Sequence, residues 1–356
     1  MSTRHYAHSG VDTGAADRAL SRLLLEVAPT QAYGPQNEIG VGHFAAVIQV
    51  GPLRLALTTD GVGSKVLIAE SMERYDTIGI DCVAMNVNDL LCVGATPLCM
   101  LDYIAVEHAQ PEVFAEIGRG LAEGAKRAGV SIVGGETAQL PDLLRGSAPG
   151  RGLDLAGMAL GLVPEGALID GSAVEPGDAL IGIASNGVHS NGLSLVRQAL
   201  LPKLALDSHV EELGTSLGDE LLRPTRIYVP EVRAVREAGI SPHAIAHITG
   251  DGLLNLRRIE APVGYEIRGL PEPPAVFALV ERLGEVERGE MRTVFNMGIG
   301  MGLTVSEADC ERALAAIRGT GTEAWRIGTA VADPQRRIRL PSEGLVGESK
   351  RFVPEG

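Results

Sequence analysis

The stretch DTIGIDCVAMNVNDLLCVGATPLCMLDYIA, residues 76–105, decides the fold. Residues 76–93 are typical of a helix, because Asp76 can cap its start and Gly94 can end it. Residues 98–105 are rich in apolar and β-favouring side chains and predict a strand directly after this helix. The pair indicates a protein that mixes helices and strands.

The predicted helix carries three polar side chains on an otherwise apolar surface. At 100° per residue, Asp81 and Asn88 lie almost on one line, and Asp89 lies beside Asn88. The opposite face is apolar and consists of Ile78, Cys82, Val83, Val87, Leu90 and Leu91. Buried carboxylates and amides need polar partners, whereas a solvated face needs none. For the helix taken alone, the solvated face is the favoured interpretation.

Helices and strands are also predicted on both sides of this stretch. The sequence predicts helices over 12–28, 111–128 and 191–200, and strands over 44–50, 53–59, 98–105, 130–133, 155–163, 179–184, 243–248 and 294–305. Residues 164–178 are rich in turn-forming residues and mark the expected junction between two domains, 1–168 and 169–356. The expected fold class is therefore α/β of the mixed α+β kind, in two halves, without a regular βαβ series.

The composition restricts the possible function classes. The chain has 356 residues, of which 45% are hydrophobic and 21% charged, as expected for a globular protein. A formal charge of −14 and an aromatic content of 3% argue against binding to nucleic acid or to an anionic membrane. The four cysteines show no zinc or disulfide spacing, and no apolar run suggests a signal peptide or a membrane span. The expected location is the cytoplasm.

Familiar nucleotide-binding and hydrolase motifs are missing from the sequence. GVGSK at 61–65 has the wrong spacing for a P-loop, and no G-x-G-x-x-G joins a strand to a helix. Neither G-x-S-x-G nor H-E-x-x-H occurs. A nucleotide would have to be held in another way. Residues 34–44, rich in Gly, Pro and amides, read either as a lid over a ligand or as a flexible linker.

Acidic residues at two strand ends change the interpretation of the helix. Asp60 follows the strand LRLALTT, and Glu136 follows VSIVGG. If they converge with Asp81 and Asp89, their oxygens can hold Mg²⁺ together with the phosphates of a nucleotide. Without cations the four acids would repel one another. Lys65, after a Gly-rich turn, either reaches a phosphate or is a solvated surface lysine, and the sequence leaves both open.

A loop in the second half supplies candidate substrate-side residues. SNGVHSNG, residues 185–192, places His189, Ser190 and Asn191 at the start of a predicted helix. A lone histidine is usually structural. One at a helix start, where N–H groups point outward, is better placed for acid–base or anion chemistry.

A second loop has the position of a phosphate cradle. HITGDG, residues 247–252, leads from a strand end to a helix start and offers Thr249 and Gly250. Its Asp251 would repel a phosphate unless it points away. Asn296, in VFNMGIGM, is a weaker candidate.

At these residues the chain resembles the aminoimidazole ribonucleotide synthetase family, the phosphoribosylformylglycinamidine cyclo-ligases of purine biosynthesis. The matching segments run in family order over nearly the whole chain: SGVD (9–12), TTDGVGSK (58–65), DTIGIDCVAMNVNDLLCVGATPLCMLDYIA (76–105), IVGGETAQLPDL (132–143), LDLAGMALG (153–161), SNGVHSNGLSLVR (185–197), LLRPTRIYV (221–229), AHITGDGLLNLRR (246–258), EMRTVFNMGIGM (290–301) and AWRIG (324–328). The chain departs from the commoner family pattern at GVGHFA (40–45), TAQLPD (137–142) and TGDG (249–252).

The resemblance implies a two-domain fold whose N-terminal domains pair into a β-barrel, and hence a homodimer. It implies ATP in a cleft beneath the Gly-rich N-terminal segment, with Mg²⁺ on Asp60, Asp81, Asp89 and Glu136. Nucleotide contacts are expected from Asp60, Gly61, Gly63, Lys65, Asn88, Gly135 and Thr137. Substrate contacts are expected from His189, Ser190, Asn191, Thr249, Gly250 and Asn296, and catalytic roles from His189, Asp89 and Lys65.

The implied reaction is the ATP-dependent ring closure of formylglycinamidine ribonucleotide. ATP phosphorylates the formamide oxygen, and the amidine nitrogen then attacks the formamide carbon and expels phosphate. His189 is the expected base that removes the ring protons.

Other functions remain as alternatives to this reaction. A thiamine-monophosphate kinase-like activity would share the acids but not HSNG or FNMGIGM. A non-catalytic dimeric binding module would have lost acids, yet all are present. A selenophosphate synthetase would need a cysteine in 29–50, and a hydrogenase-maturation relative would need one at the C-terminus; neither is found.

Overall fold

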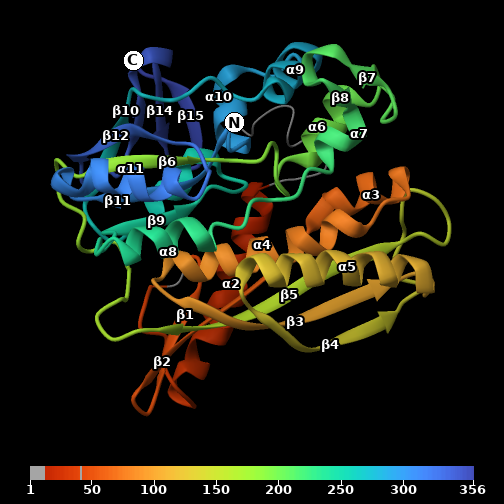
Figure 1. Ribbon diagram of the computed structural model, residues 1–356, viewed down its shortest axis with the longest axis horizontal. Helices are drawn as coiled ribbons and strands as arrows, with labels where there is room; N and C mark the ends of the chain where they lie inside the picture. The colour runs from red at the N-terminus through yellow and green to blue at the C-terminus, as the bar shows by residue number, and fades with distance from the viewer. Residues whose placement is uncertain (1–12, 41) are drawn as a thin grey trace.

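The structure is a computed structural model that describes residues 13–40 and 42–356. The motif SGVD (9–12) lies outside this part of the chain. The expected mixed fold in two halves is confirmed (Figure 1).

In the first half, five strands form one sheet in the order β1-β2-β5-β3-β4. Only the β3–β4 pair is parallel. Its elements are α2 (Thr13–Val27), η1 (Ala28–Ala32), β1 (Ala46–Val50), β2 (Leu53–Gly61), η2 (Gly63–Lys65), α3 (Val66–Met72), α4 (Asp76–Cys92), β3 (Thr96–Val106), α5 (Pro111–Ala128), β4 (Ser131–Gln139) and β5 (Leu153–Val163). Helices α4 and α5 lie along one face of this sheet, between it and the second half (Figure 1).

The second half contains an eight-stranded sheet in the order β15-β14-β13-β10-β12-β6-β11-β9, and a small hairpin of β7 and β8. Its elements are β6 (Ala179–Ala184), α6 (Leu193–Leu200), β7 (His209–Val210), η3 (Glu211–Leu213), β8 (Thr215–Ser216), α7 (Leu217–Leu221), α8 (Val229–Glu237), β9 (Ala244–His247), η4 (Gly252–Arg258), β10 (Val263–Ile267), α9 (Ala275–Gly284), α10 (Arg288–Val294), β11 (Ile299–Val305), η5 (Glu307–Asp309), α11 (Cys310–Gly319), β12 (Ala324–Ala332), β13 (Ile338–Leu340), η6 (Pro341–Glu343), β14 (Leu345–Glu348) and β15 (Arg351–Pro354). Strand β9, at the edge of this sheet, packs against α4 of the first half.

Most predicted elements are confirmed, with a few differences. Strand β4 is longer than predicted, because it continues through Gly134, Gly135 and Glu136 in parallel pairing with β3. The segment after residue 252 is a 3₁₀ helix, η4, rather than an α-helix. Lys65 ends the short 3₁₀ helix η2 just before α3.

Helix α4 is buried on almost all sides, so its polar face is not solvated. Asp81, Asn86 and Asn88 have no exposed surface. The interpretation favoured for the helix alone was wrong, because β9 and the loop before α8 cover the face that periodicity assigns to water. Its carboxylates and amides must therefore find partners within the protein.

The two halves share their cores. The hydrophobic cluster around α4 also takes in Leu193, Val196 and Phe277 from the second half. The other large cluster, inside the eight-stranded sheet, takes in Phe44 and Leu91 from the first. The turn-rich residues 164–178 contain no helix or strand, but apolar packing does not stop there. Division at residue 168 remains a prediction.

No helix in the described part of the chain has the length and apolar character needed to cross a membrane.

Candidate functional site

Two carboxylates, Asp60 and Asp89, come close together where the two halves meet. Asp60 lies near the end of β2, and Asp89 lies on the last turn of α4. Burial and, secondly, the negative charge of Asp89 raise the pKa of Asp60 to about 6. The mutual repulsion is only partly offset by the N–H of Gly61 and by the positive charge of Arg258 from the second half. Such a pair is the arrangement that a cation would stabilise.

Asp89 is held by a histidine that the sequence analysis did not select. His247, the last residue of β9, is fully buried, and its Nδ1 lies 2.8 Å from Oδ1 of Asp89. Its Nε2 lies 3.4 Å from Nδ2 of Asn88. The only available signal was its place at a strand end, two residues before the Thr249–Gly250 turn. The pairing itself depends on how the two halves meet.

The side-chain amide of Asn88 already forms hydrogen bonds within the protein, so it is not available to a nucleotide in this structure. Its Oδ1 accepts a hydrogen bond from the N–H of Tyr228 at 2.9 Å, and its Nδ2 donates to the carbonyl of Arg226 at 2.8 Å. The side chain is completely buried. The expected nucleotide contact therefore has no geometric support, because the second half covers this position.

Lys65 and Asp81, expected as a phosphate ligand and a metal ligand, form a buried ion pair with each other. Nζ of Lys65 lies 3.0 Å and 2.9 Å from the two oxygens of Asp81 and donates to the carbonyl of Arg223 at 2.6 Å. Oδ1 of Asp81 also accepts from Ser190 Oγ and from the N–H and Oγ1 of Thr225. Burial lowers the pKa of Lys65, which Asp81 opposes. The pair joins the two halves and leaves Asp81 little capacity to bind a metal.

His189 is buried and accepts hydrogen bonds from the backbone. Its Nε2 accepts from the N–H of Asn186 at 2.9 Å and of Arg226 at 3.4 Å, and Nδ1 has no partner. Burial, above all, holds the pKa of this imidazole well below its usual range. Proton removal by His189 stays a prediction, and the geometry favours the alternative of a loop brace.

The other expected substrate-side residues divide into half-buried and buried groups. Asn191 faces the cradle loop, because a Cβ added at Gly250 would lie 3.3 Å from its Oδ1. The N–H of Thr249 donates to Oδ1 of Asn255 at 2.9 Å. Asp251 is turned toward Arg258, 3.4 Å away.

Asn296 is buried and structural in this arrangement. Its Nδ2 donates to the carbonyls of Gly187 and Val188, and its Oδ1 accepts from the N–H of Gly298. It thus holds the loop that carries His189, with its amide fully used.

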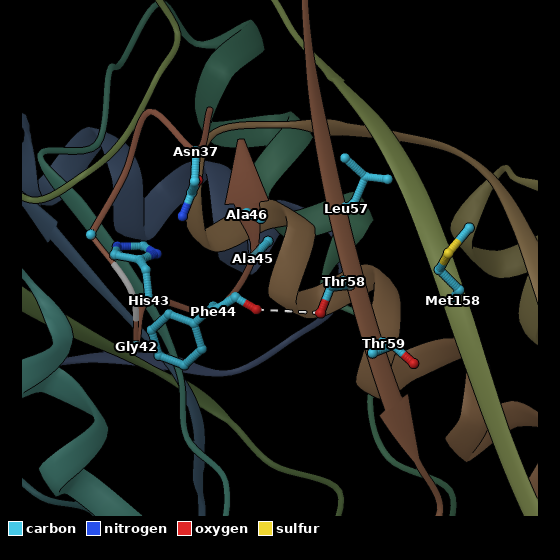
Figure 2. A pocket seen from close by; sticks show the side chains of 11 residues that line it. Asn37, Gly42, His43, Phe44, Ala45, Ala46, Leu57, Thr58, Thr59 and Met158 are labelled. Atoms are coloured by element: carbon cyan, nitrogen blue, oxygen red, sulfur yellow. Dashed lines mark hydrogen bonds between the residues drawn. The ribbon is translucent and has the colours of Figure 1, made fainter. Parts of the chain in front are cut away.

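A cavity of about 370 Å³ opens beneath the Gly-rich segment. Figure 2 shows Asn37, His43 and Phe44 on one side of it and Leu57 and Met158 on the other. The Oγ1 of Thr58 donates to the carbonyl of Phe44 and ties the segment to β2 (Figure 2). The guanidinium of Arg258 lies 4.8 Å from the centre of the Phe44 ring. This end of the cavity therefore leads toward Asp60, whose negative charge also interacts with Arg258.

A second cavity, of about 330 Å³, is lined by Glu136, Gly135 and Asp102 and shares Thr59 and Met158 with the first. The carboxylate of Glu136 is exposed there and accepts from the N–H of Thr137 at 2.7 Å. A Cβ at Gly135 would lie 2.7 Å from the backbone oxygen of Asp102, so a larger residue would require the backbone to shift. The two cavities adjoin each other at Thr59 and Met158, and together they are called the cleft below.

The four acids expected to hold Mg²⁺ are not gathered into one group. Across residues 13–40 and 42–356, no three His, Cys, Asp or Glu side chains lie close enough to hold a metal by themselves. Asp60 and Asp89 fit such an ion because two half-buried carboxylates repel each other in one region. Asp81 does not fit, because Lys65 and Thr225 already use its oxygens. Glu136 lines the second cavity and does not join Asp60 and Asp89 in a group of three.

Comparison with known proteins places this geometry in a family. AIR synthase related protein, N-terminal domain, matches residues 42–163, and AIR synthase related protein, C-terminal domain, matches residues 175–341. The chain is 46% identical over 346 residues to a phosphoribosylformylglycinamidine cyclo-ligase of Methanothermobacter thermautotrophicus, covering 97% of this chain and 98% of that one. It is 45% identical to the cyclo-ligase of Thermococcus kodakarensis, covering 94% and 97%.

Solved structures share the fold. A HypE–HypF complex superposes with a TM-score of 0.64 at 22% identity, covering 92% of this chain and 99% of that one. AaThiL complexed with AMPPCP and TMP gives 0.62 at 14% identity, covering 92% and 95%. The two family domains, the full-length similarity and the shared architecture agree: the chain belongs to the AIR synthase family.

Proposed function

We propose that this protein is a phosphoribosylformylglycinamidine cyclo-ligase, a ligase of purine biosynthesis. It uses ATP to close formylglycinamidine ribonucleotide into 5-aminoimidazole ribonucleotide, with release of ADP and phosphate. The observation that carries the proposal is similarity of about 45% identity, along nearly the whole chain, to curated enzymes of that name. A thiamine-monophosphate kinase-like activity has the support only of a shared fold, at 22% identity or less.

We assign the nucleotide to the cleft between the Gly-rich segment and the sheet. Its first cavity has the volume and the mostly apolar walls that suit a purine ring, with Phe44, Leu57 and Met158 as walls. Thr59 lines this cavity, and the next residue is Asp60. A base seated there would direct its phosphates toward Asp60 and Asp89. The exposed Glu136 would face the same cleft from β4.

Mg²⁺, bound through Asp60 and Asp89, would supply neutralisation of the phosphate charge during transfer to the formamide oxygen. Arg258 is positioned to add positive charge at the same end of the cleft. Asn191 and the Thr249–Gly250 loop provide polar groups on the substrate side. The Lys65–Asp81 pair serves to hold the two halves in register.

We also propose a homodimer in which two copies meet through the uncovered face of the five-stranded sheet. That face exposes Leu98, Leu101, Tyr103, Val133 and Met158, with 37% to 64% of each side chain accessible. A contiguous apolar surface on a sheet usually marks an interface. The cleft opens on the same face, since Leu101, Tyr103 and Met158 line its second cavity.

The test is an assay of purified protein with formylglycinamidine ribonucleotide, ATP and Mg²⁺. Stoichiometric ADP, phosphate and aminoimidazole ribonucleotide are expected, and thiamine monophosphate is expected not to be phosphorylated. Asp89→Asn should abolish turnover while preserving the fold, because it removes a carboxylate charge from the proposed metal site. Phosphorylation of thiamine monophosphate without ring closure would overturn the proposal.

A further inference from the structure

We propose that His247 is a positioning residue that fixes the carboxylate of Asp89 through a hydrogen-bond relay starting at Asn88. This inference rests on the proposed function, because Asp89 matters to the reaction only as part of the metal–nucleotide site. His247 itself touches neither cavity. Its role would be to act through Asp89.

The relay begins at the Asn88 amide, whose two backbone partners fix its orientation. Its Oδ1 faces a backbone N–H, that of Tyr228, and its Nδ2 faces a backbone carbonyl, that of Arg226. Rotating the amide by 180° would place oxygen against oxygen and donor against donor. The amide therefore has one orientation, and its second N–H points toward Nε2 of His247, 3.4 Å away.

The orientation of Asn88 determines the tautomer of His247. Because Asn88 presents a donor to Nε2, that nitrogen must act as the acceptor and carry no proton. The ring proton then lies on Nδ1. From there it is donated to Oδ1 of Asp89 over 2.8 Å, a length typical of a hydrogen bond to a carboxylate.

The relay restricts rotation of the Asp89 carboxylate. One carboxylate oxygen is held by a side chain with no exposed surface, so the group cannot rotate freely. The second oxygen would then be the one available to a cation bound between Asp89 and Asp60, whose charges interact. Substituting a residue that hydrogen-bonds to a metal-binding carboxylate typically lowers metal affinity or activity ~10–100-fold. Because His247 belongs to the second half and Asp89 to the first, their bond also sets this orientation across the junction.

The relay can be tested with two substitutions that differ in which ring nitrogen they replace. In His247→Asn the amide nitrogen occupies roughly the position of Nδ1 and can still donate to Asp89. In His247→Gln the amide extends to the position of Nε2 and cannot. His243 supplies a matched control, because its Nδ1 pairs with Asp178 at 2.7 Å just before the same strand, away from the proposed site.

The measurement is the calorimetric affinity for a non-hydrolysable ATP analogue with Mg²⁺, together with the thermal midpoint of each variant. We expect H247N to bind within about threefold of the wild type and H247Q to bind ~10–100-fold more weakly, with H243Q unchanged. H247Q binding as the wild type does, or H247N binding as poorly as H247Q at an equal thermal midpoint, would overturn the inference.

Imidazole nitrogen shifts of the wild-type protein, measured by NMR with nitrogen-15-labelled histidine, give an independent readout. The neutral Nδ1–H tautomer is expected at His247, and an Nε2–H tautomer would refute the relay without any mutation. If the wild type fails to bind the analogue at all, the proposed function fails instead. The tautomer then still decides whether the relay exists.

Discussion

His189 has a left-handed backbone, with φ of 65°, which a residue with a Cβ adopts only when its surroundings stabilise it. Here the stabilisation comes from two backbone N–H groups that donate to its ring. A His189→Ala variant should lose thermal stability, because each buried N–H without a partner costs ~1–3 kcal/mol. We expect its turnover per folded molecule to stay within about threefold of the wild type. Calorimetric unfolding and single-turnover kinetics on the same sample measure both quantities.

The opposite result for His189→Ala, lost turnover with unchanged stability, would identify His189 as a base. A loss of ~10²–10⁴-fold in turnover with an unchanged thermal midpoint would contradict the brace and support proton removal by the imidazole. His189→Gln serves as control, because its side-chain oxygen can replace Nε2 as the acceptor. It should regain stability if bracing is the role.

Glu70 provides a pH-dependent test of stability. Its side chain is buried, and Oε2 accepts from the N–H of Ser147 at 2.6 Å, which anchors the loop after β4. Burial raises the pKa of Glu70 above its usual 4.5. The folded protein therefore holds this proton more tightly than the unfolded chain does. The stability so gained is present below pH 4.5 and is lost as the pH rises through the raised pKa.

We therefore expect the free energy of unfolding of the wild type to fall, relative to Glu70→Gln, as the pH is raised from 4 to 7. Urea titrations of both proteins across this range measure the difference. A difference that does not change with pH would show that Glu70 keeps its ordinary pKa in the folded state.

The residue types at the site were more predictable than their partners. Asp60 and Asp89 could be selected because each acid interrupts or follows an apolar element. The surroundings of Lys65, Asp81 and Asn88 could not be predicted. Apart from the Lys65–Asp81 contact itself, their partners lie more than a hundred residues away, in the loops at 189–190 and 223–228. Local periodicity contains no information about such pairings. His247 was overlooked for the same reason.

At the scale of elements, α4 and α5 pack closely because glycines face each other. A Cβ at Gly79 would lie 2.4 Å from the backbone nitrogen of Leu121, and one at Gly120 would lie 2.1 Å from the carbonyl oxygen of Asp76. These clashes involve backbone on both sides, so rotamer changes cannot relieve them. The helices could not remain this close with any larger residue.

Gly120→Ala should therefore destabilise the protein by at least ~1–3 kcal/mol, the usual cost of overpacking a core. Gly118→Ala is the matched control on the same helix, since a Cβ there meets nothing within 4 Å. It should be neutral or stabilising by up to ~1 kcal/mol, because alanine favours a helix. Equal unfolding midpoints for the two variants would mean that α5 can shift away from α4.

The ends of helices and strands were predicted well where nearby residues determine them. They were predicted less well where pairing with a neighbouring strand determines them. The ends of α4 and α5 follow from the residues at Gly94 and Gly129, which have positive φ and stop each helix. The extension of β4 through Gly134 and Gly135 does not follow from propensity, since glycine disfavours strands. The parallel ladder with β3 holds these residues in place. The second cavity exists because that extension carries Glu136 along the sheet.

For the whole molecule, the uncovered sheet face leads to a prediction about assembly. Leu98 on β3 and Val133 on β4 are exposed on their strands and line neither cavity of the cleft. We expect the wild type to sediment as a dimer at micromolar concentration. The double variant Leu98→Glu/Val133→Glu should be monomeric, because an interface that buries two unpaired carboxylates per chain would lose its stability.

Leu143→Glu is the control for this experiment, because Leu143 is exposed in the loop after β4 rather than on the sheet. It should remain dimeric. The monomeric variant should keep its thermal unfolding cooperative, since the substituted side chains contribute little to either core. It should bind the ATP analogue more weakly, because a partner on this face would lie over the cleft that Thr59 and Met158 line. A monomeric wild type would contradict the assembly, and a monomeric variant with unchanged nucleotide affinity would separate the interface from the site.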